Sequence, residues 1–405
     1  MKGIDMNSRV ETLLTAKWNS QIGEHEENYF SKINVSRDLD LFPKKFIERF
    51  VDKNEGEFFN IEFKKGELFD FSEDNIINLS KKQFSPPKTF LNKRPLIGRF
   101  YPLGFFKGLA GVFSSNINPT RIIAINEESS EITIDTNIPI ARYDINIEIA
   151  IERIIRKSGG AGGECRDWFA IAFQNGPGMQ VRFNGIETDF EFENSETFER
   201  EDETDDSIFY KEPRLTTHID SRCNENLLKT YNRILPSKGK LLDLMSSYQS
   251  HIPEDKDFHV IGLGLNKEEM KHNNRLHENI IHDLNKNPVL PFSNEEFDVV
   301  VCDLSIEYIT KPFELISEIR RILKSNGVVT FSFSNRYFPP KVIKIWTDLH
   351  DFERVGYVIE LLLRNGGFKD FKTFSYRGFS RPFYDKYFTD TLLSDPLYVV
   401  YAMKQ

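Results

Sequence analysis

The stretch "EFDVVVCDLSI", residues 296–306, decides the fold of the second half of the chain. Its centre, from Val299 to Val301, is apolar at every position and shows no alternation with polar residues. A strand that is covered on both faces has this pattern, and such strands are typical of parallel sheets flanked by helices. The stretch therefore predicts a central strand of an α/β sheet.

Strands and helices alternate on both sides of this stretch, from about residue 221 to the end. Apolar runs predict strands at 240–245, 257–265 and 327–335, and two final strands at 368–377 and 396–405 that could pair antiparallel. Patterns with helical spacing predict helices over 224–235, 311–327 and 353–368. This order predicts a parallel sheet whose strands are joined by crossover helices.

The composition limits the function of the chain. With 405 residues it is long enough for two or three domains, and its net charge of -9 argues against nucleic-acid binding. Its three cysteines are widely spaced, which argues against a disulfide framework and against a metal site. The first 24 residues contain no apolar core of the length expected for a signal peptide, and no apolar run reaches membrane-spanning length. We therefore expect a cytoplasmic protein without metal, and the oligomeric state stays open.

The first half has the pattern of a β-rich α+β domain over 26–157. Residues 55–63 and 143–155 alternate apolar and polar side chains, as half-buried strands do. Residues 43–50 predict one short helix, and residues 127–130 a turn between two strands. The preceding residues, 1–25, are expected to form a polar and perhaps helical leader.

A connector over 158–220 separates the two patterns. It begins with a glycine-rich stretch at 157–168 that lacks the lysine and hydroxyl residue of a phosphate-binding loop, so we expect a flexible joint. Residues 189–206 carry the acidic run "DFEFENSETFEREDETDD". Such a run usually forms a solvated or mobile face, and a docking site for a basic partner is the alternative.

The second half, 221–405, resembles the class I S-adenosylmethionine-dependent methyltransferases of the type 11-like branch. The stretches "LLDL" at 241–244 and "HVIGLGLN" at 259–266 are similar to the first two motifs, and 280–335 is similar to the central block. The resemblance implies a Rossmann-like sheet of seven strands, S-adenosyl-L-methionine as the cofactor, and methyl transfer to a small-molecule or protein acceptor. The expected cofactor residues are Asp243, Met245, Ser246, Ser247, Gly262, Gly264, Asn266, Asp283, Leu284 and Ser305.

The resemblance also implies a role for each part of this set. Asp243 and the turn at 245–247 would face the methionine portion of the cofactor. Asp283 and Leu284 would contact its adenine. The turn is a variant, because Met245 stands where the family has its first glycine, and the two serines could also be an ordinary turn. Gly264 replaces the acid that usually binds the ribose, so Asn266 or Glu268 would have to substitute.

The acceptor side is less defined by the sequence. Two pairs of residues follow predicted strands at positions where methyltransferases often contact their substrate: Glu307 with Tyr308, and Asn335 with Arg336. A solvated helix start explains the first pair equally well, and a surface salt bridge explains Arg336 equally well. His251 is a candidate general base or a structural residue, and Cys302 is expected to be a buried small side chain. Methyl transfer needs alignment more than side-chain chemistry, so no catalytic residue is predicted.

Residues 41–84 and 98–154 resemble the FKBP/SlyD kind of peptidyl-prolyl isomerase. The family's Asn-His-Pro-Leu-Ala-Gly stands here as residues 137–142, "NIPIAR". The resemblance implies a small β domain that binds a peptide and presents the substrate. Two alternatives stay open for the whole chain: a non-catalytic Rossmann-like pseudoenzyme that binds a peptide, and prolyl isomerisation by the first domain.

Overall fold

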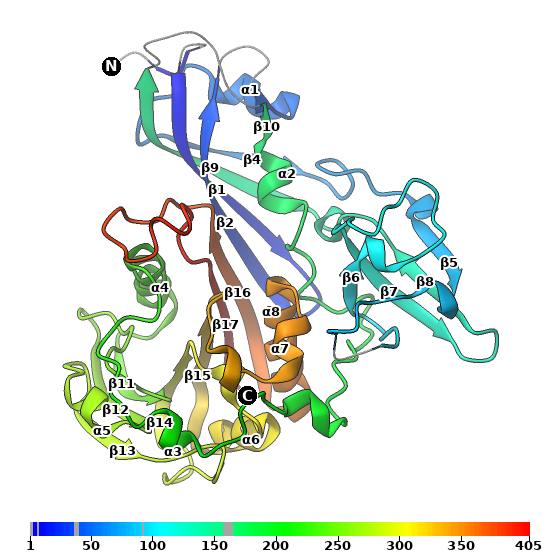
Figure 1. Ribbon diagram of the computed structural model, residues 1–405. Helices are drawn as coiled ribbons and strands as arrows, with labels where there is room; N and C mark the ends of the chain where they lie inside the picture. Colours follow the sequence, from blue (N-terminus) through cyan, green and yellow to red (C-terminus); the bar gives the residue numbers. More distant parts are fainter. Residues whose placement is uncertain (1–2, 6–7, 36–39, 91–92, 157–164) are drawn as a thin grey trace. The chain divides into compact units, whose positions relative to one another are not determined.

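The computed structural model describes residues 3–5, 8–35, 40–90, 93–156 and 165–405 (Figure 1). The chain divides into two compact units. Unit 1 comprises 1–189 with 375–379, and unit 2 comprises 190–374 with 380–405. The glycine-rich joint falls largely on 157–164, outside the described residues.

A sheet with the strand order β2-β1-β9-β4 forms the main layer of unit 1. Its strands are β1 (Ser8–Asn19), β2 (Gly23–Asn34), β4 (Phe58–Phe63) and β9 (Ile145–Arg156), and every neighbouring pair is antiparallel. The isoleucines 145, 147, 149 and 151 of β9 are all buried, so the predicted alternation is confirmed. The predicted helix is present as α1 (Lys44–Phe50), and its Phe46 and Phe50 enter the same core.

The expectation of a polar leader over 1–25 is wrong, because most of it is strand. Val10, Leu14, Ala16 and Trp18 of β1 are buried, and this two-residue period is the pattern of a half-buried strand. Thr12 interrupts the apolar series, and its hydroxyl is 2.6 Å from that of Ser31 on β2. A buried hydroxyl with a partner is tolerated in a core, which is why the polar composition was misleading.

Unit 1 also contains a second, smaller sheet with the order β5-β8-β7-β6. Its antiparallel strands are β5 (Ile76–Ser80), β6 (Phe100–Pro102), β7 (Pro119–Asn126) and β8 (Glu131–Asp135), and the predicted turn at 127–130 joins β7 to β8. The unit also contains the short parallel pair β3 (Asp40–Leu41) and β10 (Arg166–Asp167), the helix α2 (Trp168–Phe173) and four 3-10 helices in its described residues.

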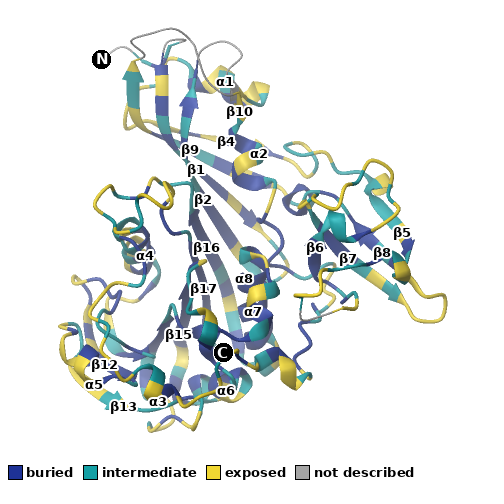
Figure 2. Ribbon diagram, viewed as in Figure 1, coloured by how far each residue is buried: buried dark blue, intermediate teal, exposed yellow. Residues whose placement is uncertain are grey.

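Unit 2 carries the predicted α/β pattern. Among its strands the order is β13-β12-β11-β14-β15-β17-β16, parallel from β13 to β15, with β17 antiparallel to β15. The strands are β11 (Lys238–Leu244), β12 (Asp257–Gly264), β13 (Glu278–Ile281), β14 (Phe297–Asp303), β15 (Leu323–Phe333), β16 (Phe368–Arg377) and β17 (Leu397–Lys404). The last three residues of β16, 375–377, are assigned to unit 1. Val299 to Cys302 of the central β14 are fully buried, as their unbroken apolar run predicts. Figure 2 shows the neighbouring strands β15 and β17 mostly in the dark blue of buried residues.

Helices connect these strands on both sides of the sheet. They are α3 (Asp206–Phe209), α4 (Ser221–Ile234), α5 (Lys267–Lys271), α6 (Pro312–Ile322), α7 (Lys344–Asp348) and α8 (Asp351–Asn365). Helices α4 and α8 both contact β17 and lie on opposite sides of it in Figure 1. The helix predicted over 311–327 ends earlier, because Leu323 is already extended and begins β15 beside Phe297.

The acidic run is anchored in the core of unit 2 from residue 190 onward, while most of its acids are exposed, so the expectation of a solvated face holds for those acids. Phe190 and Phe192 alternate with its acids and are buried, and their rings lie 5.7 and 5.5 Å from that of Tyr357 on α8. Two of the acids, Glu191 and Asp206, are also buried. The phenylalanines anchor the segment, and the buried Asp206 pairs with Arg200 and Lys341 within the unit.

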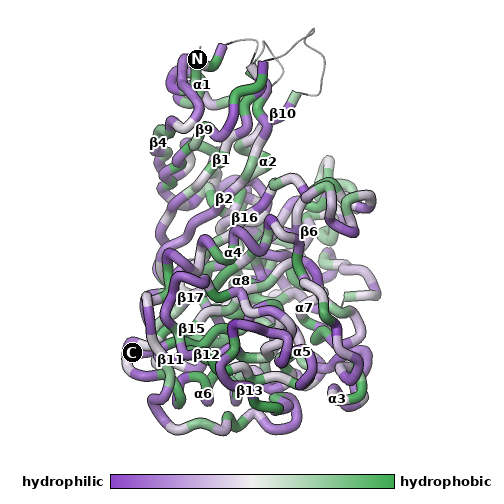
Figure 3. The backbone as a smooth tube through the Cα atoms, turned by 90° about the vertical axis from the view of Figure 1, so that its left-hand side faces the viewer, coloured by the Kyte–Doolittle hydropathy of each residue, from purple (hydrophilic) through white to green (hydrophobic). Residues whose placement is uncertain are grey.

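In Figure 3 the loops beside α5 and β13 are largely hydrophilic, while strands of the sheet carry hydrophobic stretches. No helix within the described residues is both long and apolar enough to cross a membrane. The same residues contain no group of three or more histidine, cysteine or acidic side chains arranged to hold a metal ion.

Candidate functional site

A cavity in unit 2 lies at the carboxyl ends of the parallel strands, where doubly wound sheets bind their ligands. Most of the residues singled out in the sequence line it: Asp243, Met245, Ser246, Ser247, His251, Gly264, Asn266, Asp283, Leu284, Ser305, Tyr308 and Arg336. The cavity lining does not include Gly262, Glu268, Glu307 or Asn335. The ends of five strands, β11 to β15, therefore bring residues that are far apart in the sequence to one place.

The turn after β11 is tight although it contains no glycine. Met245 adopts a left-handed backbone conformation with φ of 59°. For a residue other than glycine this conformation costs roughly 1–2 kcal/mol. The turn is held by a hydrogen bond from the Ser246 amide to the Leu263 carbonyl oxygen (2.8 Å) and by the Ser246 hydroxyl, which donates to Asp243 (2.7 Å). Met245 thus takes the conformation that glycine would normally supply.

The glycines that permit this turn lie on the neighbouring strand β12. A Cβ atom on Gly264 would come within 2.1 Å of the Ser246 carbonyl oxygen. A Cβ atom on Gly262 would come within 2.6 Å of a Leu276 methyl group and 3.1 Å of the Ser246 hydroxyl oxygen. Gly264 therefore cannot carry an acid, because the turn after β11 occupies the space its side chain would need.

Two buried carboxyl groups lie at the ends of the adjacent strands β11 and β14. Burial raises the pKa of Asp243 to about 7, and the neighbouring charge of Asp303 adds to this effect. Burial also raises the pKa of Asp303 to about 6, although Tyr231 and Ser332 donate hydrogen bonds to its Oδ1 (2.5 and 2.6 Å). Its Oδ2 has no hydrogen-bonding partner in the described residues. Such a pair favours a bound cation, which would stabilise both carboxylates.

The sequence analysis did not select Asp303, although a signal was present. Like Asp243, it is an acid at the carboxyl end of an apolar parallel strand, and strands of this kind end at the same edge of the sheet.

Asn266 is not free to bind a ligand through its side chain. Its Oδ1 accepts the amides of Glu268 and Glu269 as the cap of α5, and its Nδ2 donates to the carbonyl oxygens of Tyr210 and Lys211. Glu268 is exposed and paired with Lys271 (2.6 Å). Neither of the two expected substitutes for the missing acid is therefore placed for this role.

Glu269, the next residue, is the acid that reaches the cavity. It is buried, its Oε1 accepts the Arg214 amide (2.7 Å), and its Oε2 accepts the Ser247 hydroxyl (2.5 Å). Each carboxylate oxygen can accept a second hydrogen bond, so capacity remains for a ligand. Because Glu268 and Glu269 are adjacent, the sequence does not show which of them reaches the cavity. The orientation of α5 about its axis places Glu269 there.

Asp283 presents one oxygen to its own turn and one to the cavity. Its Oδ1 accepts the amides of Asn285 and Lys286 (3.0 and 3.2 Å). Its Oδ2 is buried and has no hydrogen-bonding partner in the described residues, with Lys286 Nζ 3.8 Å away. Leu284 is buried beside it. This arrangement can accept a donor from a ligand next to an apolar surface.

The predicted acceptor-side residues separate into two groups. Tyr308 and Arg336 line the cavity; the Tyr308 hydroxyl accepts the Phe338 amide (2.9 Å), and Arg336 pairs with Asp395 (3.0 Å). Asn335 is exposed and lies outside the lining. Glu307 is fully buried, its carboxylate has no partner elsewhere in the described residues, and burial raises its pKa to about 8.

Histidine and cysteine side chains near the cavity differ in their access to it. His251 lines the cavity and is buried, which lowers its pKa to about 4, and its Nδ1 is 2.7 Å from Asn224 Oδ1. Because that oxygen can only accept, Nδ1 carries the proton and Nε2 is left as an acceptor. Cys302 is buried in β14, as expected.

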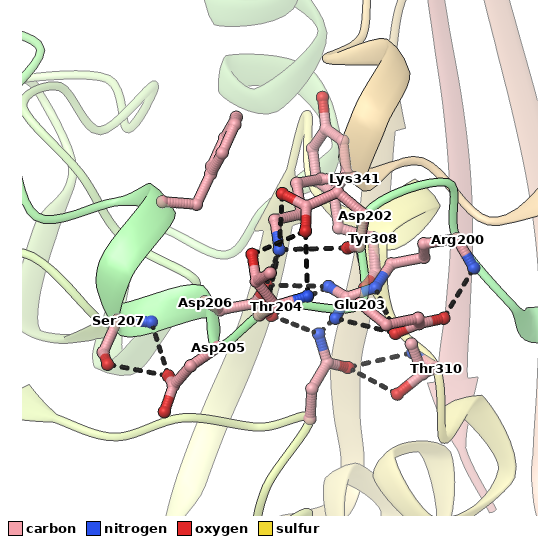
Figure 4. Close-up of polar contacts among 12 residues, drawn as sticks. Arg200, Asp202, Glu203, Thr204, Asp205, Asp206, Ser207, Tyr308, Thr310 and Lys341 are labelled. Atoms are coloured by element: carbon pink, nitrogen blue, oxygen red, sulfur yellow. Dashed lines mark hydrogen bonds and ion pairs between the residues drawn. The ribbon is translucent and has the colours of Figure 1, made fainter.

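One wall of the cavity comes from residues that the sequence analysis left in the connector. Asp206, Tyr210, Arg214 and His218 line this wall together with Phe338, which follows β15. Asp206 is held by Arg200 (2.9 Å) and by Lys341 (3.1 Å), whose side chain is fully buried (Figure 4). Burial alone would raise the pKa of Asp206, but hydrogen bonds from Asn285 and Arg200 hold it below its usual value.

Residues 246–331 match the methyltransferase domain family. The match begins in the turn after β11 and ends within β15, so the matched range contains most of the cavity lining. The wall made by residues 206–219 and by 336–338 lies outside the matched range.

A curated relative and two solved structures are also similar to this chain. The malonyl-[acyl-carrier protein] O-methyltransferase of Marinomonas sp. is 32% identical over 66 residues, which are 16% of this chain and 24% of that protein. A SAM-dependent methyltransferase of Thermotoga maritima, described as a possible histamine N-methyltransferase, is 14% identical with a TM-score of 0.34, covering 45% of this chain and 90% of its own. An S-adenosylmethionine-dependent methyltransferase of Mesorhizobium loti is 16% identical with a TM-score of 0.30, covering 44% and 96%.

Proposed function

We propose that this chain transfers a methyl group from S-adenosylmethionine to an acceptor in the cavity of unit 2. The observation that carries the proposal is the set of partly unsatisfied acids at the strand ends, within and beside the methyltransferase domain. Asp283 and Asp303 each have a buried oxygen without a partner in the described residues, and both line the cavity. Buried polar atoms normally have partners, so a ligand with donors and positive charge is the simplest occupant.

The residues present fit the parts of this cofactor. Asp283 with Leu284 would hold the adenine, since one offers an acceptor and the other an apolar surface. Glu269 would accept hydrogen bonds from the ribose hydroxyls in place of an acid at Gly264. Asp243 and Asp303 would face the positively charged portion. When bound, the cofactor supplies a methyl group on a positively charged sulfur, which is already activated for transfer.

The protein's own part in the reaction is alignment and the control of water. The turn at 245–247 and Ser305 would fix one side of the site, and the rings of Tyr308 and Phe338 would shield the other. Where an acceptor must lose a proton, His251 is neutral, and its Nε2 could accept that proton. Alignment of two bound partners removes much of the entropic barrier to their reaction.

Calorimetric titration with S-adenosylhomocysteine tests this proposal. We expect the wild type to bind, and Asp283→Ala to lose at least tenfold in affinity because a charge-assisted hydrogen bond contributes about 1.5–3 kcal/mol. Asp257→Ala, at the exposed start of β12, is the control. Absence of binding to the wild type at millimolar ligand would overturn the cofactor assignment and favour the pseudoenzyme alternative.

For unit 1 we propose binding or presentation of a polypeptide acceptor. Its loop between β6 and β7 exposes two large apolar side chains, Phe113 (76%) and Ile117 (77%), which could contact the apolar side chains of an unfolded polypeptide. Reduced, carboxymethylated α-lactalbumin is a suitable unfolded probe. We expect the wild type to bind it and Phe113→Ser to bind it less; equal binding by both proteins would contradict the role. A proline-containing peptide assay on the full chain tests prolyl isomerisation separately.

A further inference from the structure

The wall of the cavity outside the matched range has a chemistry of its own. Arg214 lies there with its guanidinium between three aromatic rings, 4.7 Å from the centre of Phe209, 4.9 Å from Phe338 and 5.3 Å from Tyr210. The rings fix the plane of the guanidinium and leave its edge for hydrogen bonds. Of the side-chain nitrogens, only Nη2 has a hydrogen bond within the described residues, a long one of 3.3 Å to the Phe209 carbonyl oxygen.

The other cations around this wall are already neutralised by acids. Arg336 pairs with Asp395 (3.0 Å), Arg200 with Asp206 (2.9 Å), and Lys341 with Asp206 (3.1 Å) and Asp202 (3.3 Å). Arg214 has no carboxylate within ion-pair distance among the described residues, and Glu269 contacts only its backbone amide. A guanidinium that lines a cavity without an acid partner is a site for an anion of planar shape.

The wall is built to keep Arg214 in place. Lys341 is fully buried and donates to the carbonyl oxygens of Asp202 (3.0 Å) and Thr204 (2.6 Å), and its Nζ lies 5.3 Å from the ring centre of Phe209 (Figure 4). Phe209 is one of the three rings around Arg214. The cluster of Arg200, Asp202, Asp206 and Lys341 therefore supports the aromatic environment of Arg214 from behind.

We propose that Arg214 binds a carboxylate group of a ligand in this cavity, with the apolar part of that ligand against Phe338 and Tyr308. This inference rests on the proposed function for its location. Two molecules could supply the carboxylate: the acceptor, or the amino-acid end of the cofactor. The position of Arg214 outside the matched range favours the acceptor.

Calorimetry with four probes distinguishes the two sources. S-adenosylhomocysteine carries the amino-acid carboxylate and 5′-methylthioadenosine lacks it; phenylacetate carries a carboxylate beside a ring and phenylacetamide lacks the charge. Wild type is compared with Arg214→Gln and Arg214→Lys, and with Arg222→Gln as control, because Arg222 is on the outside of α4 and pairs with Glu225. Thermal melting checks the fold of each variant.

We expect the wild type, saturated with S-adenosylhomocysteine, to bind phenylacetate more tightly than phenylacetamide. Arg214→Gln should lose at least tenfold for phenylacetate and keep its affinity for both nucleosides, and Arg214→Lys should be intermediate. A tenfold loss for S-adenosylhomocysteine alone, with 5′-methylthioadenosine unchanged, would also support the site and assign the carboxylate to the cofactor.

The inference is overturned if Arg214→Gln changes the affinity for none of the four probes, or if the wild type prefers phenylacetamide. Phenylacetate is also titrated without the nucleoside. If the wild type binds phenylacetate but not S-adenosylhomocysteine, the proposed function fails while Arg214 as a carboxylate site stands.

Discussion

The carbonyl oxygen of Ser246 lies 2.1 Å from the point that a Cβ atom on Gly264 would occupy. This close approach couples the turn after β11 to the end of β12, and it explains why an acid cannot stand at 264. The space for the turn comes from the neighbouring strand instead of from glycines in the turn itself.

Gly264→Ala should therefore be the most damaging single-methyl change at the site. The obstacle is backbone, so the turn must move, and we expect a loss of about 2–3 kcal/mol in the free energy of unfolding together with lost binding of S-adenosylhomocysteine. Gly262→Ala is the matched control, because its nearest obstacle is the end of the Leu276 side chain, which can rotate. Urea unfolding measures the free energy of unfolding of both variants. Equal losses in the two variants would contradict the coupling between the turn after β11 and the end of β12.

Met245 provides a second test of the same turn. Replacement by glycine removes the cost of the left-handed conformation but adds chain entropy to the unfolded state, so we expect a change within about 1 kcal/mol. Replacement by valine, whose β-branch is poorly tolerated at positive φ, should destabilise by more than about 1 kcal/mol. If the valine variant unfolds at the same urea concentration as the wild type, the assigned backbone conformation is wrong.

Glu269 and Glu268 form a natural pair of test and control. Glu269→Gln keeps the size of the side chain and removes its charge, and we expect at least a tenfold loss in affinity for S-adenosylhomocysteine. Glu268→Gln should leave the affinity unchanged, because Glu268 is exposed and bound to Lys271. The reverse ranking in calorimetry would restore the expectation drawn from the sequence.

The raised pKa of Asp243, about 7, predicts how pH affects ligand binding. A ligand with a positive charge binds the carboxylate better than the protonated acid, so affinity should rise with pH up to about 7 and level off above about 8. The ligand-free protein has the opposite dependence. The pKa of the Asp243 carboxyl is higher in the folded protein than in the unfolded chain. Its contribution to the free energy of unfolding is therefore complete below about pH 4 and is lost as pH rises through about 7.

Calorimetry at a series of pH values between 5.5 and 8.5 measures this linkage, with Asp243→Asn as the comparison. The variant should show weaker binding at neutral pH and a flatter pH dependence. A wild-type affinity that is constant over this range would show that the Asp243 carboxyl does not face the charged part of the ligand.

Lys341 predicts a large effect on stability far from the strand ends. Lys341→Met leaves Asp206 with one cation fewer in a buried place, and breaking such a network costs about 3–5 kcal/mol. Lys344→Met is the control, because Lys344 is half-exposed and its pair with Glu199 should contribute less than about 1 kcal/mol. Thermal unfolding of the two variants should differ clearly; similar melting temperatures would contradict the structural role of Lys341.

The strands of unit 2 could be predicted because their burial leaves a continuous record in the sequence. The apolar run at Val299 to Val301 predicts β14 directly, and similar runs predict β11, β12 and β15. The helix leading into β15 was extended too far, since Leu323 suits either element and only its pairing with Phe297 decides. The predicted order of strands also placed most of the cavity residues correctly, at the edge of the sheet where the parallel strands end.

Other parts of the site depend on contacts that sequence proximity does not reveal. Lys341 and Asp202 are 139 positions apart, so the acidic run could not be matched to its buried cation. The choice between Glu268 and Glu269 depends on the rotation of a helix of five residues. β1 was missed because buried Thr12 looks polar in a sequence, whereas its hydroxyl is satisfied by Ser31.

The buried cluster around Lys341 has a consequence for engineering the cavity wall that carries Arg214. It joins the segment carrying Arg200 to Asp206 with the segment carrying Phe338 and Lys341, and both lie outside the cofactor strands. A graft from another protein that exchanged only one segment would leave a charge without its counterion. The two segments must therefore be exchanged together for this wall of the cavity to change while the strand ends that form the rest of the lining remain intact.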